Sequence, residues 1–138
     1  LIEAGLEAFI HPQEVVSMLT NKKTKISSHY YQVSIGGDMA AIRGMVKYIL
    51  EQDELHGDIL DNAFIAEHTH GFEDYKKEVL ATDWNELVSQ AGLSKEQIIE
   101  SAKVYIEAKS VICCWAMGIT QHKHGVANVQ EVINLLFK

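Results

Sequence analysis

The sequence predicts an α/β protein, in which parallel strands and helices form three layers, and three observations lead to this class. The stretch Ile26–Ile35 is rich in β-branched and aromatic residues, as strands are, and it runs into a glycine pair and a helix-like segment. A second apolar run, Val111–Trp115, is followed by a polar loop and another helix-like segment. Several short amphipathic segments between them indicate a helical insert. Strands that alternate with helices are typical of a parallel sheet covered by helices.

Composition places the chain among globular proteins. The sequence has 138 residues, which suits a single domain over residues 1–138, and we see no boundary inside it. No apolar run is long enough to cross a membrane, and no secretory signal opens the chain. The net charge is −7 and no basic stripe is present, so we expect neither nucleic acid nor a membrane as a partner. Because the chain starts at Leu1 and stops inside an apolar segment, we expect an internal fragment of a longer protein.

The first elements lead up to a glycine pair. A helix is expected after Pro12, followed by a polar connector over residues 21–25. The Ile26–Ile35 strand then ends in Gly36-Gly37-Asp38, and Asp38 is a natural N-cap for a helix running to about Glu51. The apolar face of that helix comprises Met39, Ile42, Met45, Val46, Ile49 and Leu50.

The insert and the helix after it carry their own start signals. Asp58 is expected to cap a helix over Ile59–Glu67, with Leu60, Phe64 and Ile65 facing inward, and a further helix is expected over Phe72–Leu80. Two capping boxes follow: Asp83 to Glu86 opens a short turn, and Ser94 to Gln97 opens a helix over Lys95–Ala108. The buried stripe expected on that last helix is Ile98, Ala102, Tyr105 and Ile106.

The chain is organised around Val111–Gly125, which we interpret as a buried strand, a polar loop and the start of a helix. In open α/β sheets such a loop lies at the carboxyl end of a strand, where ligands bind. Gly118 allows a close backbone approach, and the helix N-terminus suits a phosphate. The following helix shows apolar residues at helical spacing: Val126, Val129, Val132, Ile133 and Leu136. The same pattern also fits an ordinary connection between a strand and a helix.

Histidines and cysteines give no assignable catalytic group. Two His-x-His pairs, His68/His70 and His122/His124, are interpreted as surface or structural, since a zinc site needs three or four ligands. A histidine-based metal-binding domain remains an alternative. The adjacent Cys113 and Cys114 are expected to be buried small hydrophobes in a reducing, cytoplasmic compartment. No nucleophile, acid, base or metal ligand stands out.

Three ordered blocks carry a resemblance to a known family. They are WAMGITQHKHGVANVQEVINLL from Trp115, the run from Tyr31 to Ala41, and the run from Leu60 to Phe72. Together they resemble the molybdopterin-dependent oxidoreductases, the group of formate dehydrogenase and dimethyl sulfoxide reductase, and most closely the formate dehydrogenase-like alpha (catalytic) subunit. The resemblance covers nearly the whole chain but only a piece of such a subunit.

The resemblance implies a Rossmann-like, dinucleotide-binding-like domain that cradles a cofactor. The cofactor would be molybdopterin guanine dinucleotide with molybdenum or tungsten, and any iron–sulfur cluster would lie outside this chain. The implied partners are the remaining domains of the same subunit, a small-molecule redox substrate and an electron-transfer subunit. The chain alone would be inactive, and its metal ligand would lie elsewhere.

The resemblance also implies which residues contact the cofactor. One wall would be Gly36, Gly37 and Asp38, with the Asp38 carboxylate accepting hydrogen bonds from guanine or ribose. The other wall would be Ala116, Met117, Gly118, Thr120 and Gln121, with His122 helping to shape the pocket. The alternative function is a noncatalytic nucleotide-binding or regulatory α/β module.

Overall fold

A computed structural model describes residues 27–121 and 123–136, and the chain divides into two compact units, Leu1–Gln32 and Val33–Lys138. Of the first unit the structure describes residues 27–32, which form neither helix nor strand. The helix expected after Pro12 and the polar connector at 21–25 lie outside the described residues. The second unit is helical, and the rest of the description concerns it.

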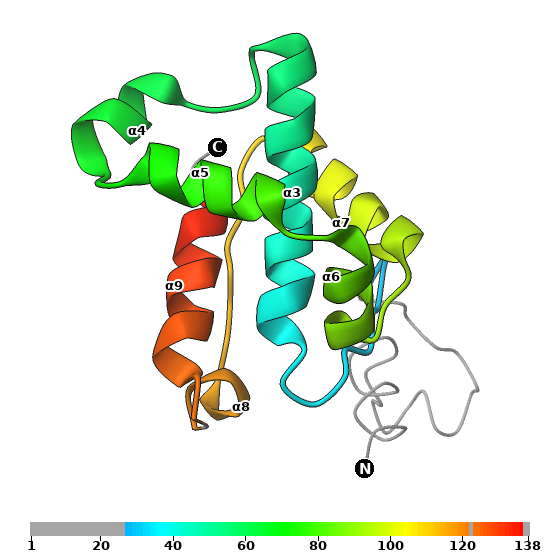
Figure 1. The fold of residues 1–138 in the computed structure, drawn as a ribbon. Coiled ribbons are helices and arrows are strands. Elements are labelled where there is room, and N and C mark those ends of the chain that lie inside the picture. Colours follow the sequence, from blue (N-terminus) through cyan, green and yellow to red (C-terminus); the bar gives the residue numbers. More distant parts are fainter. Residues whose placement is uncertain (1–26, 122, 137–138) are drawn as a thin grey trace, which may run out of the picture. The chain divides into compact units, whose positions relative to one another are not determined.

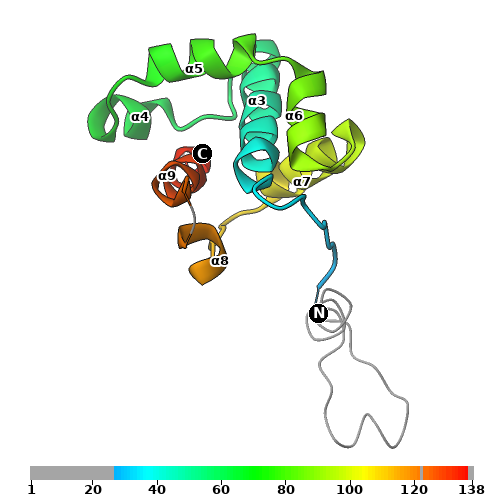
Figure 2. The same cartoon turned by 60° about the horizontal axis from the view of Figure 1, so that its bottom comes forward.

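The second unit is built around helix α3, Asp38–His56, with four of the later helices packed against it (Figures 1 and 2). The predicted apolar face is confirmed, because Val46, Ile49 and Leu50 are buried and lie at the centre of the core. The helix continues beyond Glu51 to His56 and ends at Gly57, which takes the left-handed conformation (φ 76°) that glycine adopts readily.

Four helices follow α3: α4 (Asn62–His68), α5 (Phe72–Ala81), α6 (Trp84–Ala91) and α7 (Lys95–Glu107). The predicted start signals of the last two are confirmed. Asp83 accepts hydrogen bonds from the backbone N–H groups of α6, and Ser94 and Gln97 form a complete capping box at α7. Ile98, Ala102 and Tyr105 form the buried stripe of α7, as predicted.

The start and orientation of α4 were predicted wrongly. Its N-cap is Asp61, whose carboxylate accepts from the Phe64 N–H at 2.9 Å, so Asp58 is not the cap. Ile65 is buried, but Phe64 is exposed and its ring lies against His68 instead. The segment before α4 is held by Asp53 of α3, whose carboxylate accepts from the Ile59 and Leu60 N–H groups.

The predicted parallel sheet is absent from the described residues, so the three-layer, Rossmann-like α/β class is wrong for this structure. Neither 27–35 nor Val111–Trp115 forms a strand. Every regular element among the described residues is a helix. A strand exists only when its backbone groups pair with a neighbour. β-Branched residues raise the tendency to form one but supply no partner, and Ile112, expected inside a sheet, is 87% exposed.

The chain ends in α8 (Met117–Thr120) and α9 (Gly125–Leu135). Figure 1 shows that α9 runs alongside α3 in the same direction, and Tyr105 of α7 donates a hydrogen bond to the Leu135 carbonyl. The predicted apolar face of α9 is only partly right. Val132 is buried, but Val126 and Ile133 are exposed, and the inner face carries two polar residues, Asn128 and Glu131.

None of the described helices is both long and apolar enough to cross a membrane.

Candidate functional site

The glycine pair before α3 forms a tight turn fastened to the end of α6. The Gly37 N–H donates to the Ser34 carbonyl at 2.8 Å, and the Ser34 N–H donates to the Ala91 carbonyl at 2.8 Å. A Cβ on Gly37 would lie 2.6 Å from the Gln90 carbonyl oxygen, so this glycine is required by packing inside the chain. Gly36 has a positive φ of 78° and no atom within 4 Å of a Cβ position.

Asp38 occupies the first turn of α3 and does not cap it. The N-cap is Gly37, and no side chain caps this helix start, so the predicted capping role of Asp38 is wrong. Within the part of the chain that the structure describes, neither a hydrogen bond nor an ion pair reaches the half-buried Asp38 carboxylate. A carboxylate in this setting is free to accept hydrogen bonds from a ligand.

The second predicted wall, Ala116 to Gln121, is an open loop that contains the single turn of α8. Ala116 precedes the helix in extended conformation, and the Gln121 N–H closes the turn on the Met117 carbonyl at 2.8 Å. Met117, Gly118, Thr120 and Gln121 are all exposed. A Cβ at Gly118 would meet no atom within 4 Å, so nothing in the described chain requires glycine at that position.

The loop is fixed to the start of α9 on its other side. Gly125 is buried, and a Cβ there would collide with the Thr120 carbonyl oxygen. His124 is the N-cap residue of α9 and forms no side-chain cap. Next to it, His122 lies outside the described residues, so its predicted contribution to the pocket stays a prediction.

Both predicted walls lie at the same end of the second unit, where α3 and α9 begin (Figures 1 and 2). Their side chains have a neutral or acidic character: a carboxylate at Asp38, and the Thr120 hydroxyl and Gln121 amide on the other loop. The Gln121 amide turns back onto the Met117 sulfur at 3.5 Å. The arrangement offers hydrogen-bonding groups and open backbone at one end of the packed helices α3 and α9, and we assign no nucleophile in it.

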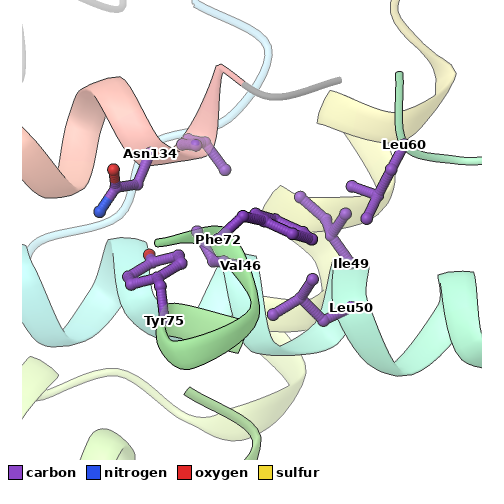
Figure 3. Close-up of a pocket in the computed structure, with 8 residues that line it drawn as sticks. Val46, Ile49, Leu50, Leu60, Phe72, Tyr75 and Asn134 are labelled. Atoms are coloured by element: carbon purple, nitrogen blue, oxygen red, sulfur yellow. The ribbon is translucent and has the colours of Figure 1, made fainter. Parts of the chain in front are cut away.

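Two hollows of the second unit lie away from these loops. One, of about 10 Å³, is enclosed by Val46, Ile49, Leu50, Leu60, Phe72, Tyr75, Asn134 and Leu135 (Figure 3). It is large enough for about one water molecule and too small for a cofactor. An open groove of about 440 Å³ lies along α4 and α5, but Glu73 and Asp74 line it, which disfavours an anionic ligand.

The cysteines and histidines differ in part from expectation. Cys113 is half-buried, and its burial raises the pKa of the thiol, whereas Cys114 is exposed, so the prediction that both are buried is wrong for Cys114. His68 is half-exposed and lies 4.0 Å from Glu67. Among the described residues, no three His, Cys, Asp or Glu side chains gather where they could hold a metal ion.

A buried ionic network between α3, α5 and α9 was missed at the level of sequence. Arg43 donates to both oxygens of Glu131, from Nε at 3.1 Å and from Nη2 at 3.3 Å, and Tyr75 donates to Oε1 at 2.9 Å. These bonds to Glu131 raise the pKa of Arg43, against the effect of burial, and burial raises the pKa of the Tyr75 phenol. Two polar residues, Asn128 and Glu131, between the apolar residues of this helix were the available signal.

A similar arrangement fixes the middle of α3 to α5 and α6. Lys47 is buried, donates to the Leu80 carbonyl at 2.5 Å and lies 3.4 Å from the Glu51 carboxylate. Trp84 donates to the same carboxylate at 3.0 Å. Both networks join helices and neither lies in a cleft, so they stabilise the unit that carries the two loops.

Sequence comparison relates the chain to oxidoreductases. It is 45% identical over 99% of its length to Protein YdeP of Escherichia coli (strain K12), and 34% identical over 99% to the uncharacterized oxidoreductase Rv2900c of Mycobacterium tuberculosis (strain ATCC 25618 / H37Rv). It is 31% identical over 80% of its length to formate dehydrogenase H of Escherichia coli (strain K12). No family model matches the chain.

These relatives define a class for the chain, which is related to redox enzymes, formate dehydrogenases among them. The match is to a part of each relative, since the chain spans about a fifth of their length: 19%, 18% and 15% in the order above.

Proposed function

We propose that this chain is the cofactor-cradling domain of a longer molybdopterin guanine dinucleotide-dependent oxidoreductase that is formate dehydrogenase-like. The observation that carries the proposal is the match of 80% of the chain to formate dehydrogenase H, at 31% identity. The resemblance of the WAMGITQH block to the molybdopterin enzymes supports the same assignment.

The local structure fits a bound cofactor at the second loop. At Gly37 any side chain would collide with carbonyl oxygens of α6, which explains the glycine. At Gly118 a Cβ would meet no atom of the described chain within 4 Å. An exposed turn with a glycine that packing does not require offers the close backbone approach that a large planar ligand needs. Packing within the helical unit does not explain why residue 118 is a glycine. The proposed cofactor contact does explain it.

The polar groups of the two loops fit a guanine dinucleotide. The Asp38 carboxylate can accept hydrogen bonds from the guanine N–H groups or a ribose hydroxyl, and Thr120 and Gln121 can contact the remainder of the group through a hydroxyl and an amide. Gly36, Ala116 and Met117 shape the backbone around these contacts. When bound, the cofactor supplies the two-electron redox chemistry, and these residues bind and orient it.

The proposal assigns the other parts of the reaction to residues outside this chain. Those parts are the metal ligand, the pocket for a small-molecule substrate, any iron–sulfur cluster and the contact with an electron-transfer subunit. The 138 residues contain no group that we assign to acid, base or nucleophilic catalysis. The remaining domains of the same polypeptide are the proposed partners of this unit.

Two substitutions in the second loop, one of a glycine and one of a glutamine, test the assignment in the longer protein. Gly118→Ala is expected to leave the helical unit folded and to lower the pterin and metal content, because the added methyl group occupies the space of the ligand. Gln121→Ala is expected to lower cofactor content as well. The control is Lys77→Ala, at an exposed position of α5, which contributes to neither loop.

Cofactor content is measured by mass spectrometry and metal analysis, and folding by circular dichroism. Wild-type cofactor content in both Gly118→Ala and Gln121→Ala would contradict the assigned wall. Loss of cofactor accompanied by loss of helix would indicate a folding defect, and Gln121→Ala, at an exposed side chain, separates the two explanations.

A further inference from the structure

Helix α9 is apolar on two sides. Its inner side buries Val132 and Leu135 against the rest of the unit. On another side lie Val126, which is 76% exposed, Val129, and Ile133, which is 50% exposed. Their spacing of three and then four residues, continued by Leu136, produces a single stripe along the helix. A helix that is apolar on more than one side is typical of the interior of a larger protein.

A second apolar surface lies on the extended chain that leads into α8. Val111, Ile112, Trp115 and Met117 are exposed there. Within the described residues, no backbone N–H or C=O between Val111 and Trp115 takes part in a hydrogen bond. Figures 1 and 2 show this segment leaving α7 and running past α3 to α8, at the start of α9.

Each surface brings several exposed apolar residues together along one segment of the chain. Contiguous exposed apolar residues mark places where another chain segment binds. Free backbone groups beside apolar side chains allow main-chain hydrogen bonds to an incoming segment, which would satisfy groups that burial would otherwise leave unpaired. The net charge of −7 argues against an anionic membrane or a nucleic acid as the occupant.

The lengths of the relatives identify the occupant. Proteins that share 34–45% identity with the whole chain are about five times as long, so most of their residues have no counterpart among these 138. We infer that Val111–Trp115 and the outer stripe of α9 form a docking surface for other parts of the same, longer polypeptide. This inference rests on the proposed function in so far as that function assumes the longer polypeptide.

Cys114 provides a reporter inside the proposed surface, because its side chain is exposed in this unit. The experiment measures alkylation by iodoacetamide in the folded longer protein and in urea, resolved by peptide mass spectrometry. The reference thiol is introduced by Lys103→Cys, at an exposed position of α7 outside the surface. Relative to urea, Cys114 should react at least about tenfold more slowly in the folded protein, because labelling then needs a local opening, while the reference thiol should change little.

A second pair of variants tests the α9 stripe. Ile133→Ser should lower the unfolding temperature of the longer protein, whereas Val104→Ser, at an exposed apolar position of similar exposure on α7, should not. Equal shifts for the two variants, or Cys114 labelled as fast as the reference thiol, would overturn the inference.

Light scattering on the same samples identifies the occupant. Protection of Cys114 in a monomer supports the same polypeptide, and protection that appears only when the protein self-associates assigns the surface to a second copy and overturns the inference. Cofactor content is measured in parallel. A cofactor-loaded protein with an open Cys114 refutes only the docking surface, and a protected Cys114 in a protein unable to bind cofactor refutes only the proposed function.

Discussion

Replacing Glu131 by glutamine should weaken the packing of α9 against α3 more than any conservative substitution at the surface does. The Glu131 side chain is 4% exposed and accepts hydrogen bonds from Arg43 and Tyr75, so Glu131→Gln removes the charge that Arg43 faces in a desolvated site. Breaking a buried ion pair costs about 3–5 kcal/mol. Arg43 is 24% exposed and keeps Glu78, so we expect the loss to be about 2–3 kcal/mol.

The matched control uses the other carboxylate of the same arginine. Glu78 lies 2.9 Å from Arg43 Nη1 but is 65% exposed, so Glu78→Gln should change stability by less than about 0.5 kcal/mol. The assay is amide hydrogen exchange of α3 and α9. It reports the local stability of these helices even when they are part of a longer protein. Similar exchange in the two variants would refute the reasoning, since it would mean that burial does not decide the strength of these pairs.

Three further predictions follow from the same structure. Gly37→Ala should lower the free energy of unfolding by about 1–3 kcal/mol, because the added Cβ would overlap the Gln90 carbonyl. Gly118→Ala should not lower it, and urea titration of the two variants makes the comparison. Asp83→Ala should lower it by about 1 kcal/mol through the lost cap, and Asp38→Ala, which removes no cap, should lower it less in the same titration. Burial raises the pKa of Tyr75 above 10.0 in the folded protein. The contribution of Tyr75 to stability is therefore complete below pH 10.0 and falls as the pH rises toward the folded pKa. Above pH 10.0, a Tyr75→Phe protein should lose less stability than the wild-type protein does.

The starts of α6 and α7 were predictable because their signals are local. The reciprocal hydrogen bonds of Ser94 and Gln97 involve residues three apart, and the Asp83 cap needs only the next turn. Asp38 shows the limit of the same signal. The turn made by Gly37 and Ser34 against Ala91 places the cap position one residue earlier, and Ala91 is distant in sequence.

The sheet and the inner face of α9 depend on partners that a local pattern does not contain. Val111–Trp115 has the composition of a strand, but no neighbour pairs with it in the described unit. Glu131 is buried because Arg43 and Tyr75 neutralise and hydrogen-bond it, which rotates Val126 and Ile133 outward. A Cβ at Gly118 would meet no atom of the described chain within 4 Å, and the ligand roles of both walls of the candidate site stay predictions.

The central claim is tested most directly by native mass spectrometry and metal analysis of the longer protein that contains this chain. The protein would be purified without oxygen from a host able to make the pterin cofactor. We predict molybdenum or tungsten together with pterin guanine dinucleotide. A folded protein with neither would contradict the proposed function and favour a noncatalytic nucleotide-binding or regulatory module.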